Sequence, residues 1–233
     1  MNIAIILSGG VGSRMDSSIP KQYIEVKGKP VIWYCLKTFV EDNSTDAIVI
    51  GVADNWKDYV IDLVSSFHTE KSVLFSKPGE TRQITIFNAL KVIECSNYSK
   101  DDIVIVHDAA RPLVSHELIK NCYDECINAD AILPVIPVKD TLYRSMDGKS
   151  IDSLLDRNTI WAGQAPEAFR FGPYLEAHEH MPYKELLNIN GSTEIAYKNG
   201  LDCKMIKGDP MNFKITTQED LSNFKMIIKD ESL

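Results

Sequence analysis

Near the start of the chain, the stretch Leu7-Ser8-Gly9-Gly10-Val11-Gly12-Ser13-Arg14-Met15 follows the apolar run Ile3-Ala4-Ile5-Ile6-Leu7. That run has the length and composition of a buried parallel strand, so the glycine-rich stretch leaves the strand at its carboxyl end, where open α/β sheets bind ligands. Glycines let backbone N–H groups approach an anion closely, and Arg14 and Lys21 add full positive charges. The sequence thus predicts an anion-binding loop.

Two common phosphate-binding motifs do not fit this loop. A Walker motif ends in Gly-Lys-[Ser/Thr], whereas here Ser13-Arg14, and not a Gly-Lys pair, follows Gly12 in the loop. The dinucleotide fingerprint requires a glycine where Met15 stands. An ordinary glycine-rich turn remains an alternative from this segment alone. The roughly twenty residues expected to lack regular structure, up to about residue 29, favour a binding loop.

Composition places the chain among ordinary globular proteins. Its 233 residues, 44 % hydrophobic and 25 % charged, predict a single α/β domain over residues 1–233. A net charge of −8 argues against nonspecific nucleic-acid binding. We find neither signal-peptide features nor an apolar run long enough to cross a bilayer, and we therefore expect a cytoplasmic protein without a membrane partner. The five cysteines are expected to be buried thiols.

Apolar patterns with strand and helix periods alternate along the chain. Strands are expected over residues 3–7, 47–52, 71–75, 103–106, 131–136 and 203–206, and helices over 31–40, 54–67, 82–93, 116–127, 172–180, 192–199 and 217–230. This order predicts a mostly parallel central sheet with helices on both faces. The alternation stops after Pro137, where two β-compatible stretches flank the turn signal Asp147-Gly148. Residues 137–162 are therefore predicted to form a protruding β-arm.

Polar residues stand where several of these strands should end. His107-Asp108-Ala109-Ala110-Arg111-Pro112 follows a strand directly, so that Asp108 is either a Mg²⁺ ligand beside phosphates or a member of a surface ion pair. The segment Pro78-Gly79-Glu80-Thr81-Arg82 enters a predicted helix. Its side chains could cap that helix, or the unpaired N–H groups at the helix start could bind a ligand. Lys214 gains significance only if the fold brings it near Arg14 and Lys21.

Taken together, these segments resemble the methylerythritol-phosphate and ribitol-phosphate cytidylyltransferases. The motifs S-G-G-V-G-S-R-M with P-K-Q-Y, then H-D-A-A-R-P, P-V-K-D-T, D-R-N, Q-A-P-E-A-F and N-F-K-I-T-T-Q-E-D-L occur in the family's order. The resemblance implies a Rossmann-like nucleotidyltransferase that condenses CTP with a polyol phosphate, using Mg²⁺ and releasing pyrophosphate. It also implies a homodimer formed through the arm.

The same resemblance implies roles for individual residues. Arg14, Lys21 and Lys214 would be the catalytic cations, and Asp108 would hold the metal. CTP would contact the first loop, the turn after residue 78 and the end of the strand at Asp108, which together comprise Leu7, Ser8, Gly9, Gly10, Gly12, Ser13, Gly79, Glu80, Arg82, Thr85, Asp108 and Ala109. The acceptor would contact Arg111, Thr141 and Arg157, with Arg157 reaching into a partner subunit.

The acceptor side departs from the family pattern at two places. The family's [Q/L]-T-P-Q segment is Gln164-Ala165-Pro166-Glu167 here, and its later T-D pair is replaced by Asn190-Gly191 or, with a two-residue shift, by Ser192-Thr193. Because lost hydroxyls should change selectivity, we expect ribitol 5-phosphate or a glycerol phosphate, for capsule or teichoic acid synthesis. Methylerythritol 4-phosphate, for isoprenoid synthesis, is the alternative acceptor.

Two other functional classes compete with these readings. A nucleotide-binding module without turnover is disfavoured by the joint presence of Arg14, Lys21, Asp108 and Lys214. A nucleotide-sugar pyrophosphorylase would share the glycine-rich start but not the D-R-N segment of the arm.

Overall fold

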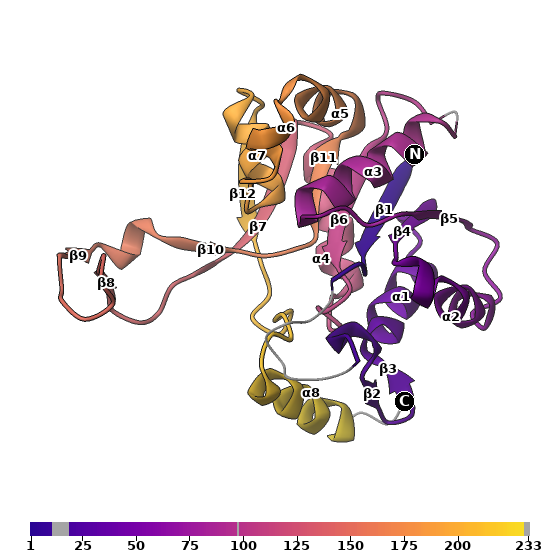
Figure 1. Cartoon of the computed structure of the whole chain (residues 1–233), viewed down its shortest axis with the longest axis horizontal. Helices are drawn as coiled ribbons and strands as arrows, with labels where there is room; N and C mark the ends of the chain where they lie inside the picture. Colours follow the sequence, from indigo (N-terminus) through magenta and orange to yellow (C-terminus); the bar gives the residue numbers. More distant parts are fainter. Residues whose placement is uncertain (11–18, 97, 231–233) are drawn as a thin grey trace.

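A central sheet with helices on both faces forms the body of the protein (Figure 1), as the alternating patterns predict. The computed structural model describes residues 1–10, 19–96 and 98–230. The strands of the sheet are β1 (Asn2–Leu7), β4 (Ala47–Gly51), β5 (Ser72–Ser76), β6 (Ile103–Asp108), β7 (Ala131–Pro137), β10 (Trp161–Gly163), β11 (Glu167–Arg170) and β12 (Cys203–Lys207). They are ordered β10-β7-β11-β6-β1-β4-β5, with β12 beside β7.

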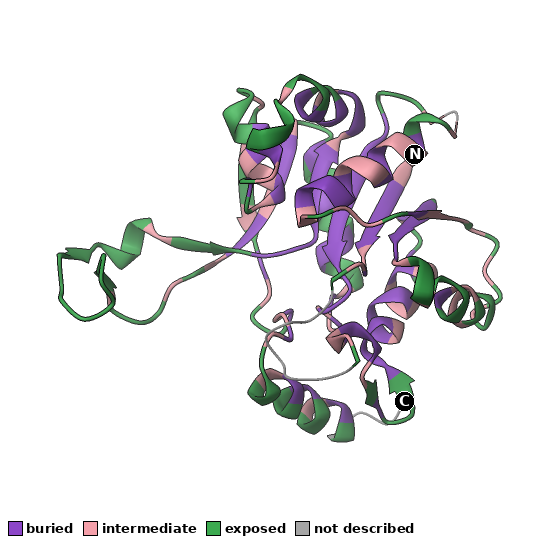
Figure 2. Ribbon diagram, viewed as in Figure 1, coloured by how far each residue is buried: buried purple, intermediate pink, exposed green. Residues whose placement is uncertain are grey.

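Two apolar layers enclose the sheet. The helices are α1 (Val31–Glu41), α2 (Asp54–Ser65), α3 (Arg82–Glu94), α4 (His116–Cys126), α5 (Phe171–His180), α6 (Tyr183–Leu186), α7 (Ser192–Lys198) and α8 (Gln218–Asp230). One layer packs α1, α2 and α4 against the sheet, and the other packs α3, α5 and α7. The central strands β1, β4 and β6 lie between both layers and are buried along most of their length (Figure 2). Their continuous Ile and Val runs are what burial on both faces requires.

The strand pairing is mostly parallel, with one insertion. β1 pairs in parallel with β4 and β6, and Leu7 stands opposite Asp108. β11 runs antiparallel between β6 and β7, so that Glu167 lies opposite Val106. The segment that follows the arm therefore enters the centre of the sheet and brings its first residues to the same edge as the end of β6.

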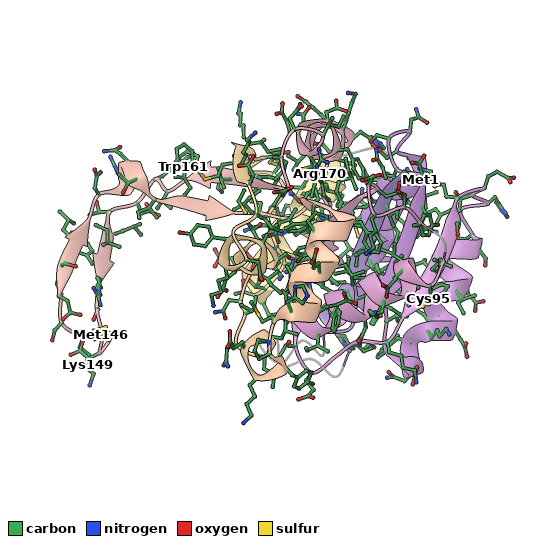
Figure 3. The ribbon with its side chains drawn as sticks, turned by 90° about the horizontal axis from the view of Figure 1, so that it is seen from above. Met1, Cys95, Met146, Lys149, Trp161 and Arg170 are labelled. Atoms are coloured by element: carbon green, nitrogen blue, oxygen red, sulfur yellow. The ribbon has the colours of Figure 1, made fainter. Side chains whose placement is uncertain are left out.

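The arm extends away from the body as a narrow ribbon (Figure 1). β7 and β10 form its base, and β8 (Leu142–Arg144) pairs with β9 (Ser153–Leu155) further out. Seen from above, Met146 and Lys149 lie at its far end (Figure 3). The prediction of a protruding β-arm is confirmed, and within one chain its large apolar side chains, such as Leu154, are exposed.

The structure corrects three local expectations. The region expected to be irregular up to about residue 29 contains a 3-10 helix, η1 (Lys21–Tyr23), and a short hairpin of β2 (Glu25–Val26) and β3 (Lys29–Pro30). A second 3-10 helix, η2 (Arg157–Thr159), and the short α6 were not expected. Cys95 is exposed and Cys203 half-buried, while the other three thiols are buried as predicted. None of the helices in the described ranges has the length and apolar character needed to cross a membrane.

Candidate active site

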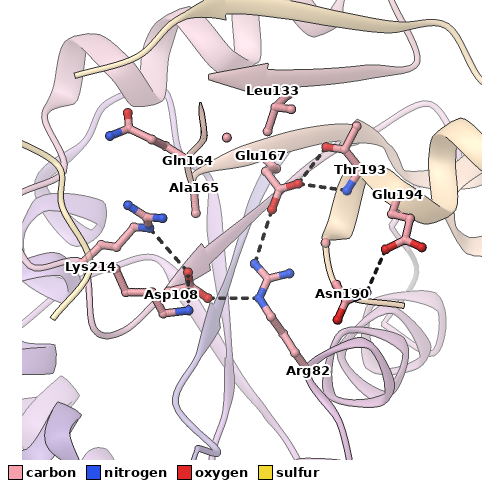
Figure 4. Close-up of a pocket in the computed structure, with 13 residues that line it drawn as sticks. Arg82, Asp108, Leu133, Gln164, Ala165, Glu167, Asn190, Thr193, Glu194 and Lys214 are labelled. Atoms are coloured by element: carbon pink, nitrogen blue, oxygen red, sulfur yellow. Dashed lines mark hydrogen bonds and ion pairs between the residues drawn. The ribbon is translucent and has the colours of Figure 1, made fainter. Parts of the chain in front are cut away.

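A polar pocket of about 320 Å³ lies at the edge of the sheet where β6 ends and β11 begins (Figure 4). Its lining residues come from α3, from β6 and the loop after it, from β7, β10 and the start of β11, from α7 and the loop before it, and from the segment before α8. They are Arg82, Asp108, Arg111, Leu133, Gly163, Gln164, Ala165, Glu167, Asn190, Gly191, Thr193, Glu194 and Lys214. The pocket is at the carboxyl end of the parallel strands, where ligand sites of open α/β sheets form.

Three cations surround the carboxylate of Asp108, the last residue of β6. Arg82 donates from Nε to Oδ1 at 3.1 Å, Lys214 Nζ lies 3.1 Å from Oδ2, and Arg111 Nε lies 3.5 Å from Oδ2. Burial raises the pKa of Asp108, but Arg82, Lys214 and Arg111 outweigh it and hold that pKa well below its usual value. The carboxylate is therefore ionised at neutral pH, and the cluster is a buried site with an excess of positive charge.

Lys214 reaches this cluster because the segment before α8 is fixed to the loop after β6. Ile215 donates its backbone N–H to the carbonyl of Ala110 at 2.8 Å, and Arg111 Nη1 donates to the carbonyl of Asn212 at 2.7 Å. Ile215 also belongs to the small apolar cluster that packs α8 against α1. Lys214 thus pairs with Asp108 at the site, and its proximity to Arg14 and Lys21 stays a prediction. Arg14 lies outside the described residues, and Lys21 begins η1.

The loop after β1 leaves the strand at the predicted edge. Ser8 donates its N–H to the carbonyl of Gly51 at 2.8 Å, and Gln22 Nε2 donates to the carbonyls of Ser8 and Gly10, each at 2.8 Å. A Cβ on Gly9 would stand 2.3 Å from Cβ of Pro78, so only glycine fits there. These contacts hold residues 7–10 beside the turn at residue 79. Gly12 and Ser13 lie outside the described residues.

The turn before α3 is built by capping. Thr81 accepts the N–H of Ile84 at 3.3 Å as the N-cap, and Gly79 donates its N–H to Thr85 Oγ1 at 2.9 Å. Glu80 is exposed and accepts a hydrogen bond from the Tyr183 hydroxyl at 2.6 Å. Arg82, the first residue of α3, lines the pocket and forms an ion pair with Asp108 there. Capping of α3 is confirmed, and three of the predicted CTP residues lie at this turn.

Glu167 has a role that the sequence reasoning missed. Its carboxylate accepts hydrogen bonds from Ser192 Oγ at 2.7 Å and from Thr193 N and Oγ1 at 2.9 and 2.7 Å. Arg82 Nη2 lies 3.4 Å away, so that Arg82 bridges Asp108 and Glu167 (Figure 4). The segment that contains Glu167 departs from the family pattern, but the predicted change of selectivity rests on the hydroxyl missing at Ala165, and no role was predicted for Glu167.

The segment before β11 is tied to the segment that carries Lys214. Gln164 donates from Nε2 to the carbonyl of Asp209 and accepts the N–H of Asp209, each at 2.9 Å. Asn212, fully buried, donates from Nδ2 to the carbonyl of Ala165 at 2.6 Å. Sequence spacing alone could not reveal these contacts, because they join residues 45 and 47 positions apart.

Two predicted acceptor residues stand apart from the pocket within one chain. Thr141 and Arg157 lie on the arm and are exposed, and Arg157 Nη1 donates to the carbonyl of Lys139 at 2.6 Å. Neither residue lines the pocket around Asp108. The third predicted acceptor residue, Arg111, does line it. Ala109, predicted to bind CTP, is buried just beyond β6 and donates its N–H to the carbonyl of Leu7 at 3.1 Å.

Comparison with known proteins gives the same family throughout. A family model described as 2-C-methyl-D-erythritol 4-phosphate cytidylyltransferase (IspD) matches residues 2–230. A protein of that name from Geobacillus thermodenitrificans (strain NG80-2) is 33 % identical over 218 residues, 94 % of this chain and 92 % of the relative.

Solved structures agree with this match. The crystal structure of Francisella tularensis 2-C-methyl-D-erythritol 4-phosphate cytidylyltransferase is 27 % identical, with a TM-score of 0.79 over 96 % of this chain and 99 % of that chain. The 4-diphosphocytidyl-2C-methyl-D-erythritol synthase structure from Anaerococcus prevotii DSM 20548 has a TM-score of 0.81 over 98 % of this chain and 96 % of that chain, and at 24 % identity it supports the fold alone. The predicted fold class is confirmed. The chain belongs to the 2-C-methyl-D-erythritol 4-phosphate cytidylyltransferase family and is a nucleotidyltransferase of the cytidylyltransferase type.

Proposed function

We propose that the chain transfers CMP from CTP to 2-C-methyl-D-erythritol 4-phosphate and releases pyrophosphate. The observation that carries the proposal is the convergence of Lys214, Arg111 and Arg82 on Asp108 beside a polar pocket, in a chain that matches this family over residues 2–230. Phosphoryl-type transfer needs alignment and charge neutralisation more than covalent help from the protein. Three cations gathered at the end of the parallel strands would supply both.

The proposed reaction is an in-line displacement at the α-phosphorus of CTP. An oxygen of the acceptor phosphate forms the new bond to phosphorus, the bond to the bridging oxygen breaks, and pyrophosphate leaves with the electron pair. Lys214, Arg14 and Lys21 would stabilise the charge that develops on the phosphate oxygens. The CTP would lie along the loop of residues 7–13 and the turn at residue 79, which meet where Gly9 packs against Pro78.

Mg²⁺ is the proposed cofactor, and Asp108 is the residue that would hold it. Mg²⁺ in nucleotide sites takes one or two carboxylates and completes its shell with phosphate oxygens and water. The ionised, buried Asp108 fits such a single-carboxylate site. Within residues 1–10, 19–96 and 98–230, no cluster of three acidic, His or Cys side chains could hold a metal alone. Bound metal would neutralise phosphate charge, and its binding would depend on the nucleotide.

The choice of acceptor follows the comparisons rather than the acceptor expected first from the sequence. The relatives named above carry methylerythritol phosphate in their names, and this supports the alternative acceptor over ribitol or glycerol phosphate. One observation still favours a second candidate, ribitol 5-phosphate: Ala165 and Asn190-Gly191, which depart from the family pattern, both line the pocket. Ser192 and Thr193 direct their hydroxyls to Glu167 and not to the acceptor.

A homodimer through the arm would complete the acceptor site. Thr141 and Arg157 lie on the arm, away from the pocket of their own chain. The exposed apolar residues of the arm, including Tyr143 and Leu154, give it a surface suited to a second copy of the chain. Arg157 would then reach the acceptor phosphate bound by the partner.

The test is pyrophosphate release from CTP and Mg²⁺ with three acceptors supplied in parallel: 2-C-methyl-D-erythritol 4-phosphate, ribitol 5-phosphate and glycerol 3-phosphate. The proposal requires the highest kcat/KM with the methylerythritol compound. A higher value with ribitol 5-phosphate would establish the second candidate. No release with any acceptor, alongside CTP binding measured by calorimetry, would favour a binding module.

A further inference from the structure

Helix α7 has no capping side chain at its N-cap position, and Glu194 in its first turn accepts the backbone N–H of Asn190 at 2.8 Å. Its N-cap is Gly191, and no side chain at that position accepts the first N–H groups of the helix. A cap normally accepts from the second or third residue of the helix. Here Thr193, the second residue, donates its N–H at 2.9 Å to Glu167 on β11, 26 residues earlier in the chain. Glu167 therefore does for α7 what an aspartate at position 191 would do locally.

The carboxylate of Glu167 is fully used by the protein. It is 7 % exposed; its Oε1 accepts from Arg82 and Ser192, and its Oε2 accepts from both the backbone N–H and the hydroxyl of Thr193. Burial of an ionised carboxylate costs free energy unless such hydrogen bonds satisfy it. Because these donors occupy both oxygens, Glu167 is placed to orient its neighbours.

Those neighbours form two walls of the pocket. Arg82 lies between Glu167 and Asp108, and its Nη1 also contacts the Ser192 hydroxyl. Asn190, just before α7, lies across the pocket from Asp108 (Figure 4), and Gly191 also lines the pocket. A shift of the α7 start would move these residues directly.

We propose that Glu167 is a positioning residue that caps α7 from β11 and fixes Arg82, and so sets the acceptor wall of the pocket at Asn190-Gly191. This inference rests on the proposed function for the identity of the acceptor. The capping part of it stands on the geometry alone.

The test is a relocation of the carboxylate. Glu167→Gln removes the charge while keeping the size, and leaves an amide N–H₂ facing donor groups. Gly191→Asp restores a carboxylate at the N-cap, where a Cβ would meet no atom within 4 Å and the backbone φ of −115° is open to any residue. The single variants and the double variant are compared with Glu179→Gln, which removes an exposed surface charge.

In Glu167→Gln we expect backbone amide exchange at the start of α7 to rise about five-fold, as loss of a cap predicts, and KM for the acceptor to rise about ten-fold. KM for CTP should rise less than KM for the acceptor, because Arg82, which is expected to contact CTP, keeps its ion pair with Asp108. Gly191→Asp alone places two carboxylates beside the same donors and should also raise the acceptor KM. The double variant should recover most of the amide-exchange protection at the start of α7 and most of the acceptor affinity. Glu179→Gln should match the wild type in both measurements.

Unchanged α7 exchange in Glu167→Gln would overturn the inference. Equal losses in CTP and acceptor KM, with a lower Tm and no recovery in the double variant, would assign Glu167 a general structural role and overturn it as well. If the wild-type enzyme turns over none of the three acceptors, the proposed function fails instead. The exchange measurements then decide the capping part without any substrate.

Discussion

Two buried histidines make the stability of this enzyme depend on pH in a range where its carboxylates do not titrate. His107 and His178 are almost completely inaccessible to solvent, and burial lowers the pKa of each to about 4. His178 donates from Nδ1 to the carbonyl of Tyr174 at 2.7 Å, and its Nε2 lies 2.5 Å from the Gln83 amide. Both rings are therefore neutral in the folded protein at physiological pH.

The sign of the effect follows from where the protons bind. In the unfolded chain a histidine takes up its proton near pH 6.5, whereas these two folded histidines take it up only near pH 4. The contribution of the two histidines to the free energy of unfolding is therefore complete above pH 6.5 and is lost as the pH falls toward 4. At pH 5 the loss is about 2 kcal/mol for each histidine, or about 4 kcal/mol together. Carboxylates with a lowered pKa, such as Asp108, lose their contribution only below about pH 4.

The measurement is the free energy of unfolding from urea titrations between pH 7.5 and pH 5. His178→Gln keeps a donor and an acceptor but cannot be protonated, so its unfolding free energy should fall by only about half as much as that of the wild type over this range. His180→Gln, at an exposed position of the same helix, is the matched control and should follow the wild type. A wild-type unfolding free energy that is constant from pH 7.5 to pH 5 would refute the reasoning.

Three further predictions concern the site. Lys214→Met should lower kcat by about 10²-fold or more while CTP affinity changes little, because the lysine charge is needed in the transition state. Steady-state kinetics measures kcat and calorimetry measures CTP affinity, and an unchanged kcat would remove Lys214 from the mechanism. Gly9→Ala should destabilise the protein by about 1–3 kcal/mol and weaken CTP binding, because the new Cβ would stand 2.3 Å from Cβ of Pro78; a Tm equal to that of the wild type would contradict this. Mixed dimers of Arg157→Ala and Arg14→Ala subunits should regain part of the activity that each variant lacks alone, whereas no recovery would place the site within one chain.

The main features of the fold could be predicted because they depend on local patterns. Continuous Ile and Val runs such as residues 103–106 identify strands that are buried on both faces, and the Asp147-Gly148 turn identifies the arm. The capping of α3 by Thr81 is equally local. Elements as short as α6, with four residues, carry too little periodicity to be detected.

The site was predictable only in part, since its contacts span most of the chain. Asp108 and Lys214 could be named from their motifs, but their 3.1 Å contact depends on how the last segment returns to the sheet. The antiparallel entry of β11 determines that Glu167 faces Arg82, and no period in the sequence specifies that direction. No role of its own was therefore predicted for Glu167, which follows the arm of residues 137–162 by five residues.

The paired contacts between Gln164 and Asp209, and between Asn212 and Ala165, also bear on how this enzyme could be redesigned. They couple the strand entry at the acceptor side to the segment that carries Lys214. A graft of residues 164–167 that replaces Gln164 by leucine would leave the backbone N–H and carbonyl of Asp209 without these partners, whereas Asn212 would keep the backbone carbonyl at position 165. Redesign of residues 165–167 in this scaffold should therefore retain the glutamine at position 164.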